Sequence, residues 1–275
     1  MPDVKLGDDS FHYESAGRGE AVVFIPGMGG DHADFRLQVP SHSRHFRCVT
    51  FDPRGAGRSA GAFRDPGAYG IDLLASDVGR LMDALGIRRA HVVGVSMGGV
   101  VAQRFALDHP DRLLSLSLHS TFARTGPLQR IAFETQILLA GKLDVADVLA
   151  SLAPLVWSEY TLVHRRDVID RFRESRRRHG VPVGREVYSL QARALCRVDL
   201  LPLLGSISVP TLVTAGARDL LVPAAASRAI HRAVPGSGYH EFRNCGHAPL
   251  VENARGFNTV SLRFLRARRD TKEKT

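Results

Sequence analysis

The sequence predicts a doubly wound α/β fold, in which helices cover both faces of a mostly parallel β-sheet. Short apolar runs alternate with amphipathic helical patterns along most of the chain, which is typical of this fold class. Several runs are apolar at every position, as central parallel strands buried on both faces must be. The expected parallel strands cover residues 21–25, 48–51, 91–95, 114–118 and 211–215.

The segment between the second and third of these strands has the pattern of a crossover helix. Its apolar residues recur at steps of three and four, and Gly86 closes it as a C-terminal cap. The recurring positions are Ile71, Leu74, Val78, Leu81 and Leu85. Residues 4–6 and 11–14 are shorter and more polar, so we expect them to form an antiparallel edge before the parallel region.

The strand and helix alternation stops between residues 122 and 204, where helical patterns dominate at 128–139, 145–152 and 168–178. Because this stretch lies between two expected strands, the sheet can close without it. A helical layer inserted over strand ends forms a lid on a pocket. We therefore expect a first core part at 1–121, a helical cap at 122–204 and a second core part at 205–275.

The strongest chemical signal is the pentapeptide GVSMG at residues 94–98, a G-x-S-x-G motif directly after the apolar strand residues 91–93 and directly before a helical pattern. A nucleophilic serine in this context occupies a sharp, strained turn, and glycines two positions before and after it leave room for that turn. The following helix directs the positive end of its dipole at the site. The motif predicts that Ser96 is a nucleophile.

A serine hydroxyl is a poor nucleophile at neutral pH, so this prediction requires a histidine base and a carboxylate that orients it. Asp219 follows the expected strand 211–215 within a turn, and His247 lies in a glycine-flanked loop after a strand-like segment at 239–242. The chain order Ser, Asp, His accompanies G-x-S-x-G turns of this kind. The sequence therefore predicts a catalytic triad of Ser96, His247 and Asp219.

Attack on a carbonyl also requires two donors for the developing oxyanion. One expected donor is the backbone N–H of Met97, because it follows the nucleophile. The second is expected from the loop after the first parallel strand, where residues 26–30 read PGMGG. We predict that the backbone N–H of Met28 is this second donor.

With these motifs the chain resembles the α/β-hydrolase superfamily, within its lid-bearing group of esterases, lactonases, C–C hydrolases and related acyl-transfer enzymes. The resemblance covers nearly the whole chain and includes DPRGAGRS at 52–59, HPDR at 109–112 and GH at 246–247. It implies the α/β-hydrolase fold, the triad and the donors above, and a mainly structural role for residues 52–59. Many relatives have His-Gly at the oxyanion loop where this chain has Pro26-Gly27, so different hydrogen bonds are expected around that loop. A serine at position 96 disfavours the dehalogenase and epoxide-hydrolase branches, which use a carboxylate nucleophile.

The expected reaction is hydrolysis of a carboxylic ester or lactone of a small organic molecule through an acyl-enzyme. Thioesterase, acyltransferase or cyclase activity and hydrolysis of a C–C bond remain open, because the same triad serves all of them. A ligand-binding protein on a hydrolase fold is the non-enzymatic alternative. Four apolar residues of the expected cap are candidates for a substrate pocket, with core packing as their alternative role: Phe133, Leu138, Val156 and Trp157.

Composition limits the expected partners to a small-molecule substrate. The formal net charge is +9, but the basic runs at 165–166, 171–178 and 263–274 do not interleave aromatic residues in a stacking pattern, so no nucleic-acid partner is expected. The chain shows neither a secretory h-region nor a long apolar run, which predicts a cytoplasmic protein without a membrane partner. Three cysteines without C-x-x-C spacing argue against disulfides or a zinc site. The triad needs no metal or organic cofactor, and the sequence leaves homo-oligomer formation open.

Overall fold

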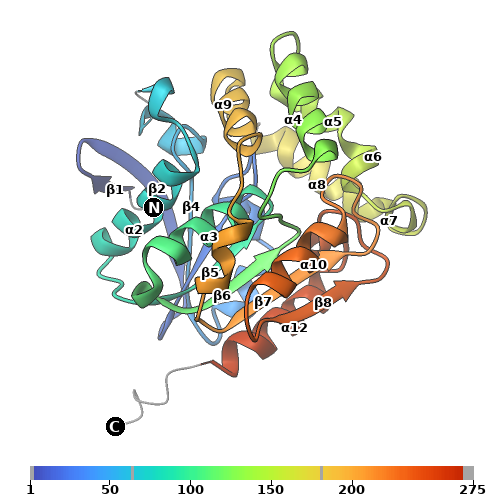
Figure 1. The fold of residues 1–275 in the computed structure, drawn as a ribbon. Coiled ribbons are helices and arrows are strands. Elements are labelled where there is room, and N and C mark those ends of the chain that lie inside the picture. Colours follow the sequence, from blue (N-terminus) through green and yellow to red (C-terminus); the bar gives the residue numbers. More distant parts are fainter. Residues whose placement is uncertain (1–2, 63–64, 180–181, 269–275) are drawn as a thin grey trace.

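The computed structural model describes residues 3–62, 65–179 and 182–268 (Figure 1). Its eight-stranded sheet has the order β1-β2-β4-β3-β5-β6-β7-β8. The last six strands of this order, β4-β3-β5-β6-β7-β8, pair in parallel. At the other edge, β1 pairs antiparallel with β2, and β2 pairs antiparallel with β4. Both the parallel region and its antiparallel edge are as the sequence predicts. The strands are β1 (Asp3–Leu6), β2 (Asp9–Ala16), β3 (Ala21–Ile25), β4 (Arg47–Phe51), β5 (Ala90–Val95), β6 (Leu113–His119), β7 (Thr211–Gly216) and β8 (Gly238–Phe242).

Helices flank the sheet. A further group of helices, inserted in the chain between β6 and β7, forms a separate layer. Those close to the sheet are α1 (Val39–His42), α2 (Ile71–Ala84), α3 (Met97–Asp108), α10 (Ala224–Ala233), α11 (Pro249–Glu252) and α12 (Ala254–Arg266). The inserted helices are α4 (Pro127–Ala140), α5 (Val145–Ser151), α6 (Ala153–Val156), α7 (Glu159–His164), α8 (Arg166–His179) and α9 (Arg185–Leu195). Short 3-10 turns include η1 (His32–Phe35), η2 (Gly57–Ala62), η3 (Pro66–Ala68), η4 (Pro110–Arg112) and η5 (Leu201–Ser206). Figure 1 shows α4 to α9 gathered beyond one end of the sheet.

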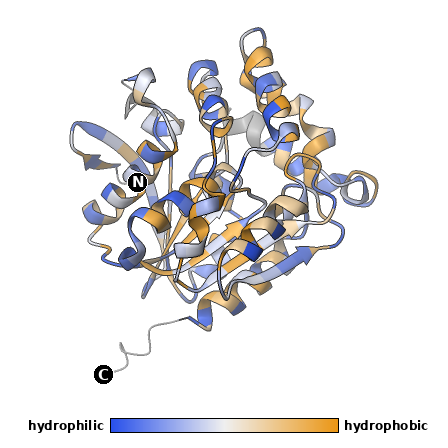
Figure 2. Cartoon of the chain, viewed as in Figure 1, coloured by the Kyte–Doolittle hydropathy of each residue, from blue (hydrophilic) through white to orange (hydrophobic). Residues whose placement is uncertain are grey.

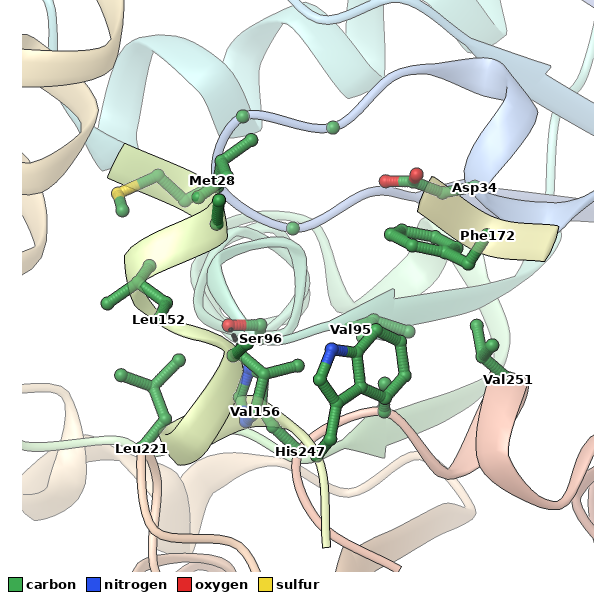
Figure 3. A pocket seen from close by; sticks show the side chains of 18 of the residues that line it. Met28, Asp34, Val95, Ser96, Leu152, Val156, Phe172, Leu221, His247 and Val251 are labelled. Atoms are coloured by element: carbon green, nitrogen blue, oxygen red, sulfur yellow. Dashed lines mark hydrogen bonds between the residues drawn. The ribbon is translucent and has the colours of Figure 1, made fainter. Parts of the chain in front are cut away.

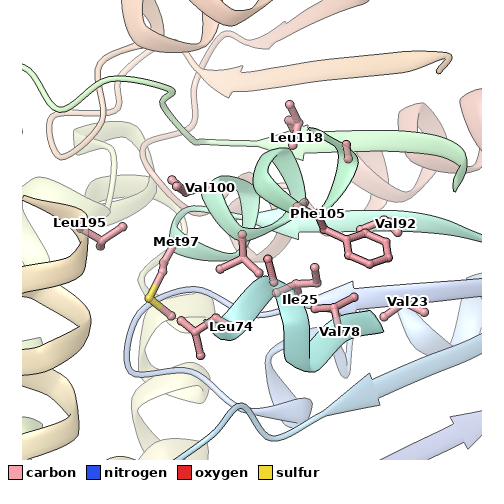
Figure 4. Packing of buried hydrophobic residues seen from close by; sticks show 14 of the residues in the cluster. Val23, Ile25, Leu74, Val78, Val92, Met97, Val100, Phe105, Leu118 and Leu195 are labelled. Atoms are coloured by element: carbon pink, nitrogen blue, oxygen red, sulfur yellow. The ribbon is translucent and has the colours of Figure 1, made fainter. Parts of the chain in front are cut away.

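The predicted crossover helix is α2, and its end follows from local sequence. The chain leaves the helix at Leu85, and Gly86 adopts φ +65°, the left-handed conformation that glycine adopts without strain. Apolar residues of α2, including Leu74 and Val78, pack against strand residues of one sheet face (Figure 4).

The core is divided by the sheet into two layers. Along β3, Val23 and Ile25 pack into the layer that contains α2 and α3, whereas Val22 and Phe24 pack into the opposite layer, which contains α12. Because side chains alternate along a strand, a run apolar at every position supplies both layers at once. Figure 2 shows this concentration of apolar residues along the central strands.

The basic side chains of these runs whose exposure the structure describes are exposed: Arg165, Arg166, Arg171, Arg173, Arg263, Arg266 and Arg268. Arg171 donates to Asp167 at 2.6 Å, and Arg166 lies 3.9 Å from Asp170, so neighbouring carboxylates offset part of this charge. Residues 269–274 of the last basic run lie outside the described residues. Within the described part of the chain, every helix is too short or too polar to span a membrane.

Candidate active site

The turn between β5 and α3 holds Ser96 in a strained conformation. Its φ is +54° and its ψ is −119°, a backbone state that costs a non-glycine residue roughly 1–3 kcal/mol. A Cβ atom on Gly94 would overlap the carbonyl oxygen of Gly98, and one on Gly98 would overlap the carbonyl oxygen of Ile25. The two glycines therefore permit the sharp turn, as the motif predicts.

Two further residues fix this turn from the neighbouring strand end. The backbone N–H of Ser96 donates to the carbonyl of His119 at 2.9 Å. The hydroxyl of Thr121 donates to the carbonyl of Ser96 at 2.7 Å. Nothing in the local sequence around Ser96 indicates these contacts, because both partners come from β6 and the loop that follows it.

Three side chains that are distant in sequence form a hydrogen-bonded chain at the carboxyl ends of β5, β7 and β8. Ser96 Oγ lies 3.0 Å from Nε2 of His247, and Nδ1 of His247 lies 2.7 Å from Oδ2 of Asp219. Asp219 is 4% exposed and His247 is 8% exposed. The imidazole donates from Nδ1 to the carboxylate and so turns the lone pair of Nε2 toward the serine hydroxyl.

The carboxylate of Asp219 is held on its other side by backbone donors. Its Oδ1 accepts from the N–H groups of Leu221 at 2.9 Å and Val222 at 2.8 Å. A buried carboxylate requires such partners, because the loss of hydration would otherwise be costly. These bonds fix the plane of the carboxylate and leave Oδ2 for His247.

The loop that carries His247 is anchored by the inserted helical layer and by a buried glutamate. The N–H of His247 donates to the carbonyl of Val156 at 2.7 Å. Glu252 accepts from the N–H of Gly246 at 2.8 Å and from the hydroxyl of Ser158 at 2.8 Å. Glu252 was not predicted from the sequence, although a carboxylate among apolar residues five positions after His247 is a local signal for such a role.

The predicted oxyanion donors lie on two backbone segments beside Ser96. The N–H groups of Met28 and Met97 have no hydrogen-bond acceptor within the described residues, and Met97 is the first residue of α3. A Cβ atom on Gly27 would lie 3.4 Å from Cβ of Ser96, so the loop passes directly beside the serine. Gln191 of α9 accepts from the N–H of Gly29 at 2.9 Å and holds this loop; the sequence does not indicate this contact.

A largely apolar cavity of about 430 Å³ opens beside Ser96 and His247. Figure 3 shows both residues at its wall, with Val156 and Leu221 next to them. The inserted helices contribute much of the lining. Of the candidate pocket residues, Phe133, Val156 and Trp157 line this cavity.

Leu138 does not belong to the pocket, and its prediction was wrong. It is 62% exposed, whereas Phe133 on the same helix is 4% exposed. Five residues correspond to a rotation of roughly 140° around an α-helix, so the two side chains point in different directions. The sequence LQRIAFETQILLA in α4 places apolar residues on several faces, which conceals the buried face.

Residues 52–59 make the structural contacts that the sequence leads us to expect. Arg54 forms ion pairs with Asp77 at 2.6 Å and Asp9 at 2.7 Å. Asp52 accepts from His32 Nδ1 at 2.5 Å and from the N–H of Arg58 at 2.9 Å. Burial alone would raise the pKa of Asp52, but the hydrogen bonds from His32 outweigh it and lower that pKa. The hydrogen bond to Asp52 and the negative charge of that carboxylate, opposed by burial of the ring, raise the pKa of His32.

A Ser-His-Asp chain at the strand ends of a parallel sheet, beneath an inserted helical layer, defines an α/β hydrolase. The family model for the alpha/beta hydrolase fold matches residues 20–254, and the chain belongs to this family. It is therefore an enzyme of the hydrolase class.

Several relatives and solved structures resemble nearly the whole chain. A Caulobacter segnis protein with the provisional name carbamate hydrolase RutD is 33% identical over 254 residues, which cover 91% of this chain and 92% of the relative. A 2-hydroxy-6-oxo-6-phenylhexa-2,4-dienoate hydrolase of Comamonas testosteroni is 31% identical and covers 98% of this chain and 95% of its own. The enol-lactonase structure from Burkholderia xenovorans LB400 has a TM-score of 0.86 at 29% identity, covering 96% of this chain and 100% of its own.

Proposed function

We propose that the chain is a serine hydrolase that cleaves a carboxylic ester or lactone of a small, largely apolar molecule through an acyl-enzyme. The observation that carries this proposal is the hydrogen-bonded chain from Ser96 through His247 to Asp219, with distances of 3.0 and 2.7 Å. A serine hydroxyl that is hydrogen-bonded to an oriented imidazole base is the arrangement that makes it nucleophilic.

In the proposed first step, Ser96 Oγ forms a bond to the carbonyl carbon while its proton moves to Nε2 of His247. The carbonyl electron pair moves onto oxygen, where the N–H groups of Met28 and Met97 stabilise the negative charge. Collapse of this intermediate breaks the ester C–O bond, and His247 returns the proton to the leaving alcohol. The acyl group then remains on Ser96.

In the proposed second step, water attacks the acyl-enzyme while His247 accepts one of its protons. The second tetrahedral intermediate collapses, Ser96 recovers its proton from His247, and the carboxylic acid leaves. For a lactone the leaving alcohol stays attached to the acyl chain, so a single hydroxy acid is released. Asp219 stabilises the imidazolium in both steps.

The pocket supports an apolar substrate. Its volume of about 430 Å³ and its lining by Phe133, Trp157 and Phe172 suit a hydrophobic group of moderate size. We further propose that residues 122–204 form a cap whose helices supply this lining, with residues 1–121 and 205–275 as the core. Substrate preference then resides mainly in the cap.

Hydrolysis of a C–C bond is the second candidate, because the Comamonas testosteroni relative is named for a dienoate substrate and matches 98% of this chain. A carbamate is a third, from the name of the Caulobacter segnis relative. The apolar lining of the pocket favours an ester or lactone with a hydrocarbon group over a small polar carbamate.

A substrate panel tests the proposal. Purified wild type and Ser96→Ala are incubated with p-nitrophenyl esters, lactones, a thioester, a carbamate and a vinylogous diketone, and products are identified by mass spectrometry. We expect esters or lactones to be turned over fastest, and only by the wild type. Faster cleavage of the diketone would replace this proposal with the C–C hydrolase, and equal turnover by Ser96→Ala would exclude the serine mechanism.

A further inference from the structure

Two histidines and a glutamate lie together on the antiparallel side of the sheet, outside the triad. His12 and Glu14 are two residues apart on β2 and therefore project from the same face. His32 begins η1, in the loop after β3. One ring nitrogen of each histidine and one carboxylate oxygen of Glu14 lie within 4.8 Å of one another. The two imidazole rings meet edge to face, with centroids 4.9 Å apart.

Both histidines contact a carboxylate through Nδ1. Nδ1 of His12 lies 3.1 Å from Oδ1 of Asp3, and Nδ1 of His32 lies 2.5 Å from Oδ1 of Asp52. A carboxylate at Nδ1 keeps the proton of a neutral imidazole there, which leaves a lone pair on Nε2. Metal-binding histidines commonly have this support, because it orients the ring and increases its basicity as a ligand.

Within the described residues, no hydrogen bond is formed by Nε2 of His12 or between Nε2 of His32 and Glu14. The His12 side chain is 0% exposed, and its Nε2 makes no hydrogen bond within the described residues. A buried polar atom without a partner is unfavourable, because it has lost its hydration and gained no hydrogen bond, so a ligand that used it would stabilise the folded chain. Nε2 of His32 lies 3.6 Å from Oε1 of Glu14, which is too long for a hydrogen bond.

We propose that His12, His32 and Glu14 form a binding site for a divalent transition-metal ion of the zinc class. The ligands are Nε2 of each histidine and one carboxylate oxygen, with water in the fourth position. Imidazole with carboxylate suits Zn²⁺. Ligand atoms about 2.1 Å from a tetrahedral ion lie roughly 3.4 Å apart. Nε2 of His32 already lies 3.6 Å from Oε1 of Glu14, and the candidate ligand atoms of the three residues lie within 4.8 Å of one another, so binding requires the side chains to move closer together.

The local charge favours a cation. Carboxylates of Asp3, Asp31 and Asp52 adjoin the two rings in addition to Glu14. The guanidinium of Arg58 lies 3.9 Å from Asp3 and offsets only part of this negative charge. A bound ion would join β2 to the loop after β3, which also carries Met28. From the cysteine spacing, the sequence predicts no zinc site. That prediction does not cover histidine and carboxylate ligands that come from separate strands and loops, because such ligands produce no spacing motif.

Metal titration of the full chain tests the proposal without reference to catalysis. The chelator-stripped protein is titrated with Zn²⁺ against a fluorescent zinc indicator, and its Tm is followed as Zn²⁺ is added. We expect one ion per chain and a Tm that rises with Zn²⁺ concentration, because the ion binds the folded state. Co²⁺ should give the intense visible absorption of a tetrahedral site.

The variants are Glu14→Gln and His32→Gln, with His164→Gln, at an exposed position at the end of α7, as the matched control. Glu14 is 46% exposed, so Glu14→Gln should fold even if His32→Gln does not. We expect at least a roughly tenfold weaker Zn²⁺ affinity in each site variant and wild-type affinity in the control. Absence of stoichiometric Zn²⁺ binding, or wild-type affinity in Glu14→Gln, would overturn the proposal.

Discussion

Glu252 accepts hydrogen bonds from both the backbone N–H and the hydroxyl of Ser158, at 3.0 and 2.8 Å. Its other carboxylate oxygen accepts from the N–H of Gly246 at 2.8 Å. Glu252 is 4% exposed, so these donors replace the hydration of its charge. One buried carboxylate thus connects the inserted helices to the loop that positions His247.

Glu252→Gln should therefore impair both catalysis and stability. The side-chain NH₂ of the introduced glutamine would face the N–H of Gly246 or the N–H and hydroxyl of Ser158, all of which donate to Glu252. Buried donors would then be left without an acceptor. We expect kcat to fall roughly tenfold and the free energy of unfolding to fall by about 1–3 kcal/mol. Steady-state kinetics and urea unfolding measure the two effects. The exposed Glu159→Gln is the control, and a Glu252→Gln variant as active and stable as that control would contradict this role.

Asp219→Asn should reduce kcat by about 10³–10⁴-fold with little loss of folding stability. The amide oxygen can still accept from Leu221 and Val222, but the amide NH₂ would face Nδ1 of His247. The imidazole would then carry its proton on Nε2 and could not accept one from Ser96. The kcat of Asp219→Asn is compared with that of the exposed variant Asp199→Asn, and a value within tenfold of wild type would argue against the proposed triad.

Phe133 and Leu138 provide a matched pair for testing the pocket, because both lie on α4 but only Phe133 lines the cavity. Phe133→Ala should raise KM for an ester with a bulky acyl group by about tenfold through loss of apolar contact. Leu138→Ala should change kcat/KM by less than about twofold, as expected of a surface substitution. A series of acyl chain lengths measures the effect. Equal responses of the two variants would place the substrate elsewhere.

His42 should make the protein less stable in acid. Its Nδ1 donates to the carbonyl of Gln38 at 2.8 Å, and its Nε2 accepts from Ser261 at 3.0 Å. Burial, opposed by the Gln38 bond, lowers the pKa of His42 from 6.5 to about 4. Between these values the unfolded chain binds a proton that the folded chain does not, so the free energy of unfolding falls as pH falls through this window.

This histidine should account for about 2 kcal/mol of stability lost between pH 7 and pH 5. Urea unfolding of wild type and His42→Gln at both pH values measures it. The variant should lose less stability on acidification than the wild type, whatever its stability at pH 7. Parallel losses in the two proteins would show that His42 is not the group responsible.

The sequence predicts those features that local pattern determines. Residues 21–25 are apolar at every position because β3 is buried on both faces. Gly94 and Gly98 are recognisable because the sharp backbone turn at Ser96 leaves no room for a side chain at either position. Contacts made across the fold leave weaker local signals. Thr121, Gln191 and Glu252 all position site segments through tertiary hydrogen bonds. The buried face of α4 could not be chosen because apolar residues occur all around that helix.

Covalent labelling with a fluorophosphonate, read by intact mass and peptide mapping, tests the nucleophile most directly. Ser120 is the matched control, since it also has a positive φ, of 48°, and lies after the neighbouring strand. We predict a single adduct on Ser96 in the wild type and in Ser120→Ala, and no adduct in Ser96→Ala. An adduct that persists in Ser96→Ala, or a wild type that remains unlabelled while it turns over ester, would contradict the assignment of Ser96 as the nucleophile.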